Sequence, residues 1–305
     1  MPPPHTLRLF PGPAHVGGVD LDRAPHVRKR LAELNAAYER DRLTPEQRDA
    51  VRGVRERVAT LPAFATLDPA DARVVVRFLR ANGWSVGRAT AAWSRAAEWR
   101  TRDGSHSPEA LAAYVVPRAL DAYGTGGPFG VDLDGAPVYV DHLGAADVPG
   151  LLRHVTVDDM CRFQEAREEF MAARVDEESA TQGTLHWGAV NVLDLAGAGA
   201  WQLSRTSVRS MRAMTRLVQL AYPDTAKRIL VVNAPWAVWL VWRALVAPFG
   251  VAPHVHVDSG TALLREFIAP DQIPASLGGT AATDGAADCF PPVRRGGGVD
   301  DALLR

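Results

Sequence analysis

Short apolar runs alternate with longer amphipathic stretches in the second half of the chain, and this alternation limits the folds that it can adopt. Residues 187–193 and 228–232 are apolar runs typical of buried strands, and the stretch between them has helical spacing over 203–221. A further run at 255–257 follows another helical stretch. Strands that alternate with helices favour a largely parallel sheet covered on both faces. The sequence therefore predicts an α/β lobe here.

The beginning of this lobe has a different pattern, which predicts an antiparallel strand pair. Residues 131–140 read as two short strands around the Asp134–Gly135 turn, and a long helix is expected over 157–178. The glycine-rich run 124–130 precedes a strand and does not open a helix, so we interpret it as a loop and not as a phosphate cradle. The sheet is therefore expected to be mixed but largely parallel.

Charged residues recur along two of the expected helices. Adjacent acids diverge on a helix, so the acids of the first helix predict a solvated face and no acid–base site; they are Asp158, Asp159, Glu168, Glu169, Asp176, Glu177 and Glu178. Four arginines recur at helical spacing in the second helix; they are Arg205, Arg209, Arg212 and Arg216. We interpret them as a solvated face, with an anion-binding stripe as the alternative.

Helix-start signals follow one another in the first half of the chain. Thr44–Gln47 has an N-cap hydroxyl, a proline at the first helical position and Gln at the third, and it opens a helix expected to end near Leu61. Asp68–Asp71 repeats the signal, and Ser85 and Ser107 open two more helices. These signals predict a small all-helical lobe in front of the α/β lobe.

The composition changes along the chain predict four segments. They are a flexible or partly helical lead over 1–43 with a weakly amphipathic helix over 26–42, the helical lobe over 44–120, the α/β lobe over 121–280, and a disordered tail over 281–305.

Several classes of protein are excluded by composition and by missing motifs. With 34 basic and 35 acidic residues among 305, the net charge of −1 gives no electrostatic footprint for nucleic acid. Neither a P-loop nor a nucleophile elbow occurs, so no enzyme is expected. Cys161 and Cys289 read as unpaired thiols, and no secretory signal or membrane span is visible, so a cytoplasmic location is expected.

The segment from Pro235 to Phe249 is almost entirely apolar and carries three tryptophans. Trp236, Trp239 and Trp242 recur at every third position and cover one broad side of a helix. Such a helix is either buried in a core or moves against lipid. Composition alone does not decide between the two.

A set of short motifs resembles the CRAL-TRIO family of lipid-binding proteins over roughly residues 68–280. The motifs keep the family's order and spacing; they are 76–81 (VRFLRA), 98–100 (EWR), 137–140 (PVYV), 192–195 (VLDL), 222–224 (YPD), 232–236 (VNAPW), 248–249 (PF) and 277–280 (LGGT). The resemblance implies a helical lobe followed by an α/β lobe whose sheet floors an apolar pocket. It also implies a mobile gate helix, here over 236–246, and a bound lipid as the ligand without any cofactor.

The resemblance places polar contacts for a lipid headgroup, but this sequence departs from the phosphatidylinositol-transfer members at most of them. Their basic pair falls on Asn82 and Gly83, their acid becomes Asp224 and their lysine becomes His254. The hydroxyl pair that meets a choline lipid falls on Ala189 and Asn191. Charge-assisted donors for a phosphate are therefore few, which favours a neutral isoprenoid or sterol-like lipid over a phospholipid.

The candidate lipid-binding residues combine the pocket floor, the gate and the end of the sheet. They are Asn191, Leu193, Asp224, Trp236, Trp239, Trp242, Phe249, His254 and His256. A metal shared by the two histidines is disfavoured, because no carboxylate or thiolate stands at ligand spacing.

We expect a non-enzymatic carrier or sensor of one hydrophobic small molecule or phospholipid. It would bind no nucleic acid and would associate transiently with cytoplasmic membranes. The alternative is a regulatory module that docks a protein or lipid-kinase partner, with its pocket permanently filled.

Overall fold

Five strands form one mixed sheet in the order β3-β4-β5-β6-β7. The computed structural model describes residues 6–7, 19–64, 66–102, 104–123, 126–202, 204–235 and 254–281. The strands are β3 (Gly126–Val131), β4 (Pro137–Asp141), β5 (Ala189–Asp194), β6 (Ala226–Val232) and β7 (Val255–Val257). β3 and β4 are antiparallel, whereas β4 through β7 are parallel. The predicted α/β fold is confirmed.

Residues 126–130 of the glycine-rich run belong to strand β3, so their interpretation as a loop is wrong. β3 begins at Gly126, where a Cβ atom would lie 2.7 Å from the Val140 carbonyl oxygen. Glycine therefore permits a close antiparallel approach that no local pattern distinguishes from a loop. The turn at Asp134–Gly135 is present as predicted, with Gly135 at φ +84°.

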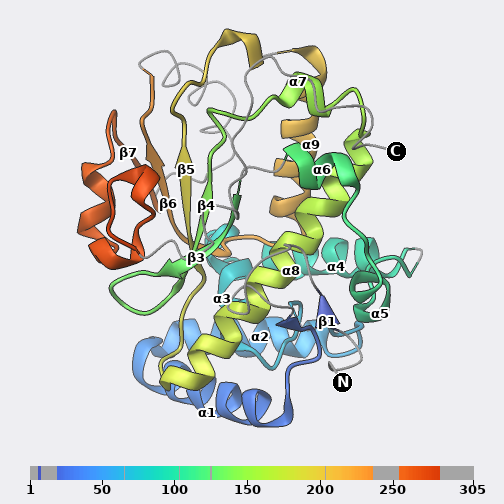
Figure 1. The fold of residues 1–305 in the computed structure, drawn as a ribbon. Helices are drawn as coiled ribbons and strands as arrows, with labels where there is room; N and C mark the ends of the chain where they lie inside the picture. Colours follow the sequence, from blue (N-terminus) through green and yellow to red (C-terminus); the bar gives the residue numbers. More distant parts are fainter. Residues whose placement is uncertain are drawn as a thin grey trace.

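The two faces of the sheet are covered by different parts of the chain (Figure 1). The segment 258–281, with the 3₁₀ turns η5 (Ala262–Glu266), η6 (Pro270–Gln272) and η7 (Ala275–Leu277), packs on one face. Side chains that point to this face are at most 2% exposed; they are Val138, Val140, Val190, Val192, Leu230 and Val232. Helix α8 (Val157–Gln182) crosses the other face, and α9 (Arg205–Ala221) packs against α8. We call these the packed face and the α8 face.

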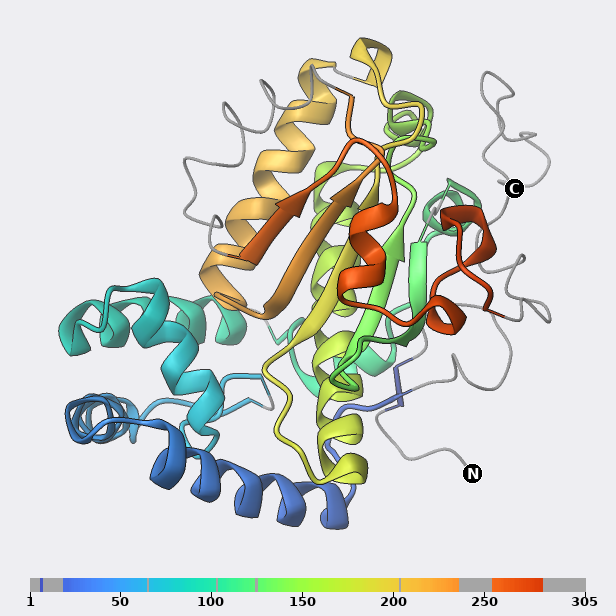
Figure 2. The ribbon, with the colours of Figure 1, turned by 90° about the vertical axis from the view of Figure 1, so that its left-hand side faces the viewer.

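The first four helices of the helical lobe lie below the sheet in Figure 1, and the second, third and fourth begin where the capping signals predict. Its helices are α1 (Pro25–Arg42), α2 (Pro45–Val58), α3 (Ala72–Ala81) and α4 (Val86–Thr101), followed by α5 (Pro108–Ala112) and α6 (Arg118–Tyr123). Thr44 forms the expected capping box, and Asp71 caps α3. α2 ends at Val58, three residues before the predicted end. Figure 2 shows α1 and α2 at the base, away from the strands.

Part of the lead before α1 packs against the rest of the molecule. Val19 and Leu21 are 1% and 2% exposed and pack against α8, beside the strand pair β1 (Thr6–Leu7) and β2 (Val19–Asp20). The helix predicted over 26–42 is present as α1. The division of the chain into four segments stays a prediction.

The acids of α8 do not all form a solvated face, so that prediction is wrong for this helix. Glu165, Glu169 and Asp176 are buried, at 1%, 4% and 8% exposure. Spacings of four and seven residues put them on one side of the helix, facing the helical lobe. Asp159 instead completes a capping box with Thr156 at the start of α8.

Gly188→Ala is expected to destabilise the fold by about 3 kcal/mol, because overpacking against backbone forces strands to move. A Cβ atom on Gly188 would lie 1.8 Å from the carbonyl oxygen of Thr225, at the entry to β5 and β6. Gly87→Ala in α4 is the matched control, since its Cβ would meet nothing within 4 Å. Urea denaturation should leave the control variant as stable as the parent or slightly more so. Equal effects of the two substitutions would contradict the prediction.

Candidate functional site

The α8 face of the sheet carries apolar side chains that the described residues cover incompletely. Leu193 and Ile229 are only half-buried although β5 and β6 are inner strands, and Val255 on the edge strand β7 is half-buried too. Val231, which pairs with Leu193 on this face, is buried at 1% exposure. Asn191 lies on the same face, because it pairs with Ile229 and alternates with Val190 and Val192. The contrast with the packed face defines a partly apolar floor, on which Tyr139 pairs with Asn191 and Asp141 with Leu193.

A small polar cavity of about 40 Å³ lies where α3, α8 and the beginnings of β5 and β6 meet. Arg73 and Arg77 line it from α3, Arg167 and Glu168 from α8, and Asn191 from the sheet. A polar cavity of this size holds about three water molecules or a small polar group of a ligand. Of the two predicted floor residues, Asn191 faces this cavity.

Helix α8 places a guanidinium and a carboxyl group side by side at the cavity. Arg167 lies over the Tyr139 ring at 4.9 Å, with its Nη1 3.4 Å from Asp141 Oδ2. Glu168 accepts hydrogen bonds from Gln164 and Thr225, at 2.7 and 3.2 Å. Burial raises the pKa of Glu168, and the nearby Arg167 charge only partly offsets it. The cavity wall thus holds the Arg167 guanidinium and, next to it, the Glu168 carboxyl group with a raised pKa.

Two of the predicted headgroup residues come together next to this cavity. Asp224 Oδ2 lies 3.1 Å from Arg80 Nε, and His254 Nε2 lies 2.8 Å from Arg80 Nη2. Because a guanidinium only donates, His254 accepts this hydrogen bond through Nε2. Burial raises the pKa of Asp224, with Arg80 and His254 acting in the opposite direction. The three side chains form one compact cluster, which we call the Arg80 cluster.

Trp187 joins the Arg80 cluster to the cavity. Arg80 lies over its ring at 4.7 Å and Arg77 at 5.7 Å, while Arg77 also donates to the Trp187 carbonyl oxygen. Burial lowers the pKa of Arg77 to about 10, and the charge of Arg73 adds to this. Arg77 and Arg80, one helical turn apart on α3, therefore both lie over the indole ring of Trp187.

The remaining predicted residues do not join this cluster. His256 pairs with Leu230, so it points to the packed face, where its ring lies 4.9 Å from that of Phe267. His254 precedes strand β7, so its side chain does not follow the alternating side-chain directions of the strand, and the two histidines lie apart. Trp236, Trp239, Trp242 and Phe249 lie outside the described residues. Within the described ranges, no group of three or more His, Cys, Asp or Glu side chains is placed to hold a metal ion.

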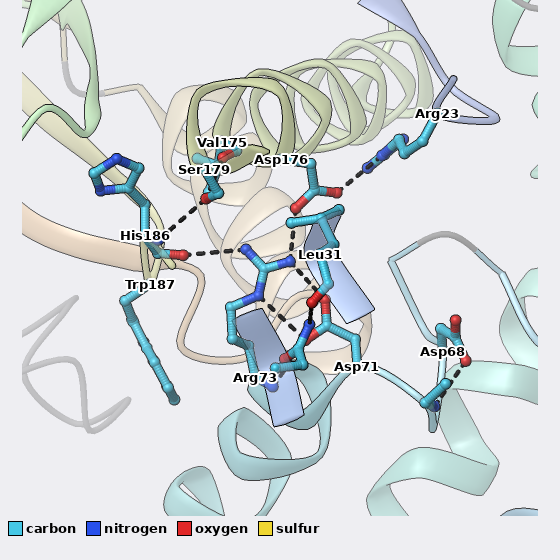
Figure 3. Close-up of polar contacts among 12 residues, drawn as sticks. Arg23, Leu31, Asp68, Asp71, Arg73, Val175, Asp176, Ser179, His186 and Trp187 are labelled. Atoms are coloured by element: carbon cyan, nitrogen blue, oxygen red, sulfur yellow. Dashed lines mark hydrogen bonds and ion pairs between the residues drawn. The ribbon is translucent and has the colours of Figure 1, made fainter. Parts of the chain in front are cut away.

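Buried ion pairs fix the helical lobe to α8 beside the cavity (Figure 3). Arg73 reaches Asp176 at 2.7 Å and Asp71 at 2.6 Å, and it donates to the His186 carbonyl oxygen at 3.1 Å. Arg23 binds the second oxygen of Asp176 at 2.9 Å. One carboxylate thus holds two arginines from different segments.

A second network sits at the carboxyl ends of β5 and β6, where the chain leaves the sheet toward Pro235. Asn233 donates to Asp194 Oδ1 at 2.7 Å, and His142 Nδ1 lies 2.8 Å from Asp194 Oδ2. Burial acts to raise the pKa of Asp194, but the bonds from His142 and Asn233 outweigh it and the pKa is lowered. Asn233 adopts φ +51°, a conformation that Asn tolerates well. The motifs around Asp194 and Asn233 therefore meet in space.

Sequence reasoning missed the arginines and aromatic residues that complete the site. Arg77 and Arg80 belong to the motif at 76–81, and their three-residue spacing on a predicted helix puts them on one face. Arg167, Tyr139 and Trp187 carried no such signal, because only the packing of α8 and α3 on the sheet brings them together.

A family model of the CRAL/TRIO domain matches residues 121–279. This match covers more than half of the chain, and the chain belongs to the CRAL/TRIO domain family. The family is one of lipid-binding and lipid-transfer proteins.

Two curated relatives are insect proteins that are longer than this chain. Protein real-time of Anopheles gambiae is 29% identical over 221 residues, which are 69% of this chain and 32% of that protein. Protein real-time of Drosophila melanogaster is 28% identical over 272 residues, 84% of this chain and 38% of that protein. The chain spans about a third of the length of these relatives.

The crystal structure of Sfh5 has the same fold. It superimposes with a TM-score of 0.57 at 14% sequence identity, over 89% of this chain and 93% of that chain. Among the described residues, no helix has the length and apolar character needed to cross a membrane.

Proposed function

We propose that this chain binds one hydrophobic ligand on the α8 face of the sheet and exchanges it with membranes. The observation that carries the proposal is the unequal covering of the inner strands β4, β5 and β6, whose valine and leucine side chains on the packed face are buried whereas Leu193 and Ile229 on the α8 face are half-buried. Apolar side chains on central strands are normally covered, so an apolar ligand is the natural complement of this floor.

The polar groups around the floor favour a weakly charged ligand. Arg80 is already neutralised by Asp224 and bound to His254. Asn82 and Gly83, at the positions of a basic pair, end α3 as its C-cap and the following turn, with Gly83 at φ +59°. Of the arginines that line the cavity, Arg73 and Arg167 are likewise paired with carboxylates, whereas Arg77 forms no ion pair among the described residues. Few cationic donors therefore remain for a phosphate. We therefore place a neutral isoprenoid or sterol-like lipid before a phospholipid.

A carrier of such a ligand needs a closed cavity. A lipid with about 30 methylene groups would cost roughly 24 kcal/mol if its chains were exposed to water. We propose that residues 236–246 form the gate that closes the cavity, with Trp236, Trp239 and Trp242 moving between the ligand and the membrane interface. Tryptophan suits that position, because its ring enters the acyl boundary while its N–H stays hydrated.

Mass spectrometry of the organic extract of purified protein tests the proposal. The same protein is analysed again after incubation with excess mixed-lipid vesicles. A stoichiometric lipid that exchanges is the expected result. A lipid that never exchanges would favour the regulatory module, and phosphatidylinositol as the lipid would contradict the headgroup argument.

Trp239→Glu is expected to slow lipid transfer between vesicles more than tenfold, because a carboxylate in the apolar region costs roughly 2 kcal/mol or more. Transfer of a fluorescent lipid is measured, with circular dichroism as the check on folding. Leu133→Glu is the control; Leu133 is 61% exposed on the β3–β4 turn, so this variant adds the same charge away from the proposed gate. Unchanged transfer by a folded Trp239→Glu variant would remove this helix as the gate.

A further inference from the structure

Helix α9 carries four arginines and no acidic residue. The arginines are spaced by four, three and four positions, so they form one stripe about 16 Å long. All are exposed; they are Arg205, Arg209, Arg212 and Arg216. The opposite side of α9 is buried through Ser207, Ser210 and Leu217. The exposure of the four arginines agrees both with a solvated face and with the anion-binding stripe that was its alternative.

The arginine stripe has no counter-charge within the described part of the chain. None of the four arginines forms an ion pair there, whereas buried arginines such as Arg73 and Arg100 are paired. The whole chain has a net charge of −1, so this concentration of unpaired positive charge is local. A surface of this kind attracts a polyanion.

An uncharged apolar tip adjoins the first turn of α9. Residues 195–202 (LAGAGAWQ) hold no charge, and Trp201 is 46% exposed there. Leu143, on the neighbouring loop after β4, is 37% exposed. The Gln202 amide ties the two loops together by donating to the carbonyl oxygens of Leu143 and Ala146, at 2.8 and 2.9 Å. The tip is therefore held in place and presents an indole to solvent.

We propose that the α9 stripe and the Trp201 tip form a docking surface for membranes that contain anionic phospholipid. An exposed indole beside a row of arginines matches the two layers of such an interface, the acyl boundary and the charged headgroups. Nucleic acid would use the arginines but not the apolar tip. This inference rests on the proposed exchange with membranes and assigns the contact to a surface other than residues 236–246.

Flotation with phosphatidylcholine vesicles, with and without phosphatidylserine, tests the surface. Each arginine near an anionic surface changes partitioning by about fivefold, so Arg209→Gln combined with Arg212→Gln should weaken binding by about 25-fold. Trp201→Ala should weaken it several-fold, and salt should weaken the parent protein. Arg28→Gln combined with Arg57→Gln removes the same charge from exposed positions on α1 and α2 and is the matched control.

The expected result is loss of binding for both α9-surface variants with the control unchanged. Equal binding of all four proteins, or no preference for phosphatidylserine, would overturn the inference. Binding to single-stranded RNA is measured in parallel. If the α9-surface variants lost RNA binding but kept vesicle binding, the inference would also be overturned. Lipid content by mass spectrometry separates the two proposals. If the protein holds an exchangeable lipid but the α9 variants bind vesicles as the parent does, only the docking surface is refuted. If the protein holds no lipid but its vesicle binding depends on α9, only the proposed carrier function is refuted.

Discussion

Glu169→Ala is expected to lower the free energy of unfolding by about 4 kcal/mol, because it leaves a buried arginine without its counter-charge. Arg100 is 1% exposed, and its Nη1 lies 2.8 Å from Glu169 Oε1. Thr66 and Tyr222 donate to the same oxygen at 2.6 and 2.8 Å. The substitution thus orphans three buried or half-buried donors at once. Urea denaturation followed by tryptophan fluorescence measures the loss.

Acid should abolish the difference between the parent and the Glu169→Ala variant. Burial alone would raise the pKa of Glu169, but the Arg100 charge and the hydrogen bonds of Thr66, Arg100 and Tyr222 outweigh it, and the pKa is lowered. A lowered pKa contributes stability above the pKa of the unfolded chain, and this contribution is lost as the pH falls through the folded value. The two stabilities should therefore converge below about pH 4.

Two further variants test whether the buried Arg100–Glu169 pair is the cause of the loss. Glu178→Ala, on the same helix, removes a partly exposed partner of Arg174 at 3.5 Å and should cost less than about 1 kcal/mol. Arg100→Met combined with Glu169→Leu replaces the pair by apolar side chains and should recover most of the loss. A Glu169→Ala protein as stable as Glu178→Ala would show that the buried pair contributes nothing.

Asp176→Ala is expected to cost about 3 kcal/mol and to loosen the lead from α8. Asp176 binds both Arg23 and Arg73, which are 6% and 2% exposed. Arg73 keeps Asp71 as a partner, whereas Arg23 loses its carboxylate. Limited trypsin digestion should then cleave after Arg23 earlier than in the parent protein, and urea denaturation gives the energy.

Glu177→Ala is the matched control for this site, because it removes the neighbouring acid. Glu177 lies 4.0 Å from Arg174 and is 37% exposed, so its loss should change stability by less than about 1 kcal/mol. Asp176→Asn should fall between the two, since it keeps one acceptor oxygen. Trypsin digestion that is as slow in Asp176→Ala as in Glu177→Ala would contradict the role of Asp176 in holding the lead.

The helical lobe shows how far local signals reach. The capping box of Thr44 and Gln47, the N-cap of Asp71 and the hairpin turn at Gly135 all lie where the sequence predicts them. Each depends on residues at most four positions apart, so the chain carries the whole interaction in one short window. The end of α2 is less well predicted, because packing and not a local stop signal sets it.

The α8 acids show where local reasoning ends. Glu169 and Asp176 look like members of a surface charge run, yet their partners lie 69 and 103 positions away in Arg100 and Arg73. Burial of a carboxylate requires a matching cation from another element, and no window of the sequence contains both. Only the spacing of Glu165, Glu169 and Asp176, which places them on one side of the helix, indicates in the sequence that these acids share a buried face.

The sequence by itself determined the class of fold, the positions of most elements and the family, because apolar periodicity, caps and short motifs are local properties. The tertiary structure decided which side chains share the site. Arg80 and His254 are 174 positions apart and meet only because α3 packs at the edge where β7 begins. The alternation of β7 then sends His256 to the packed face. Position along a chain does not specify such meetings, because they depend on how separate elements pack around the sheet.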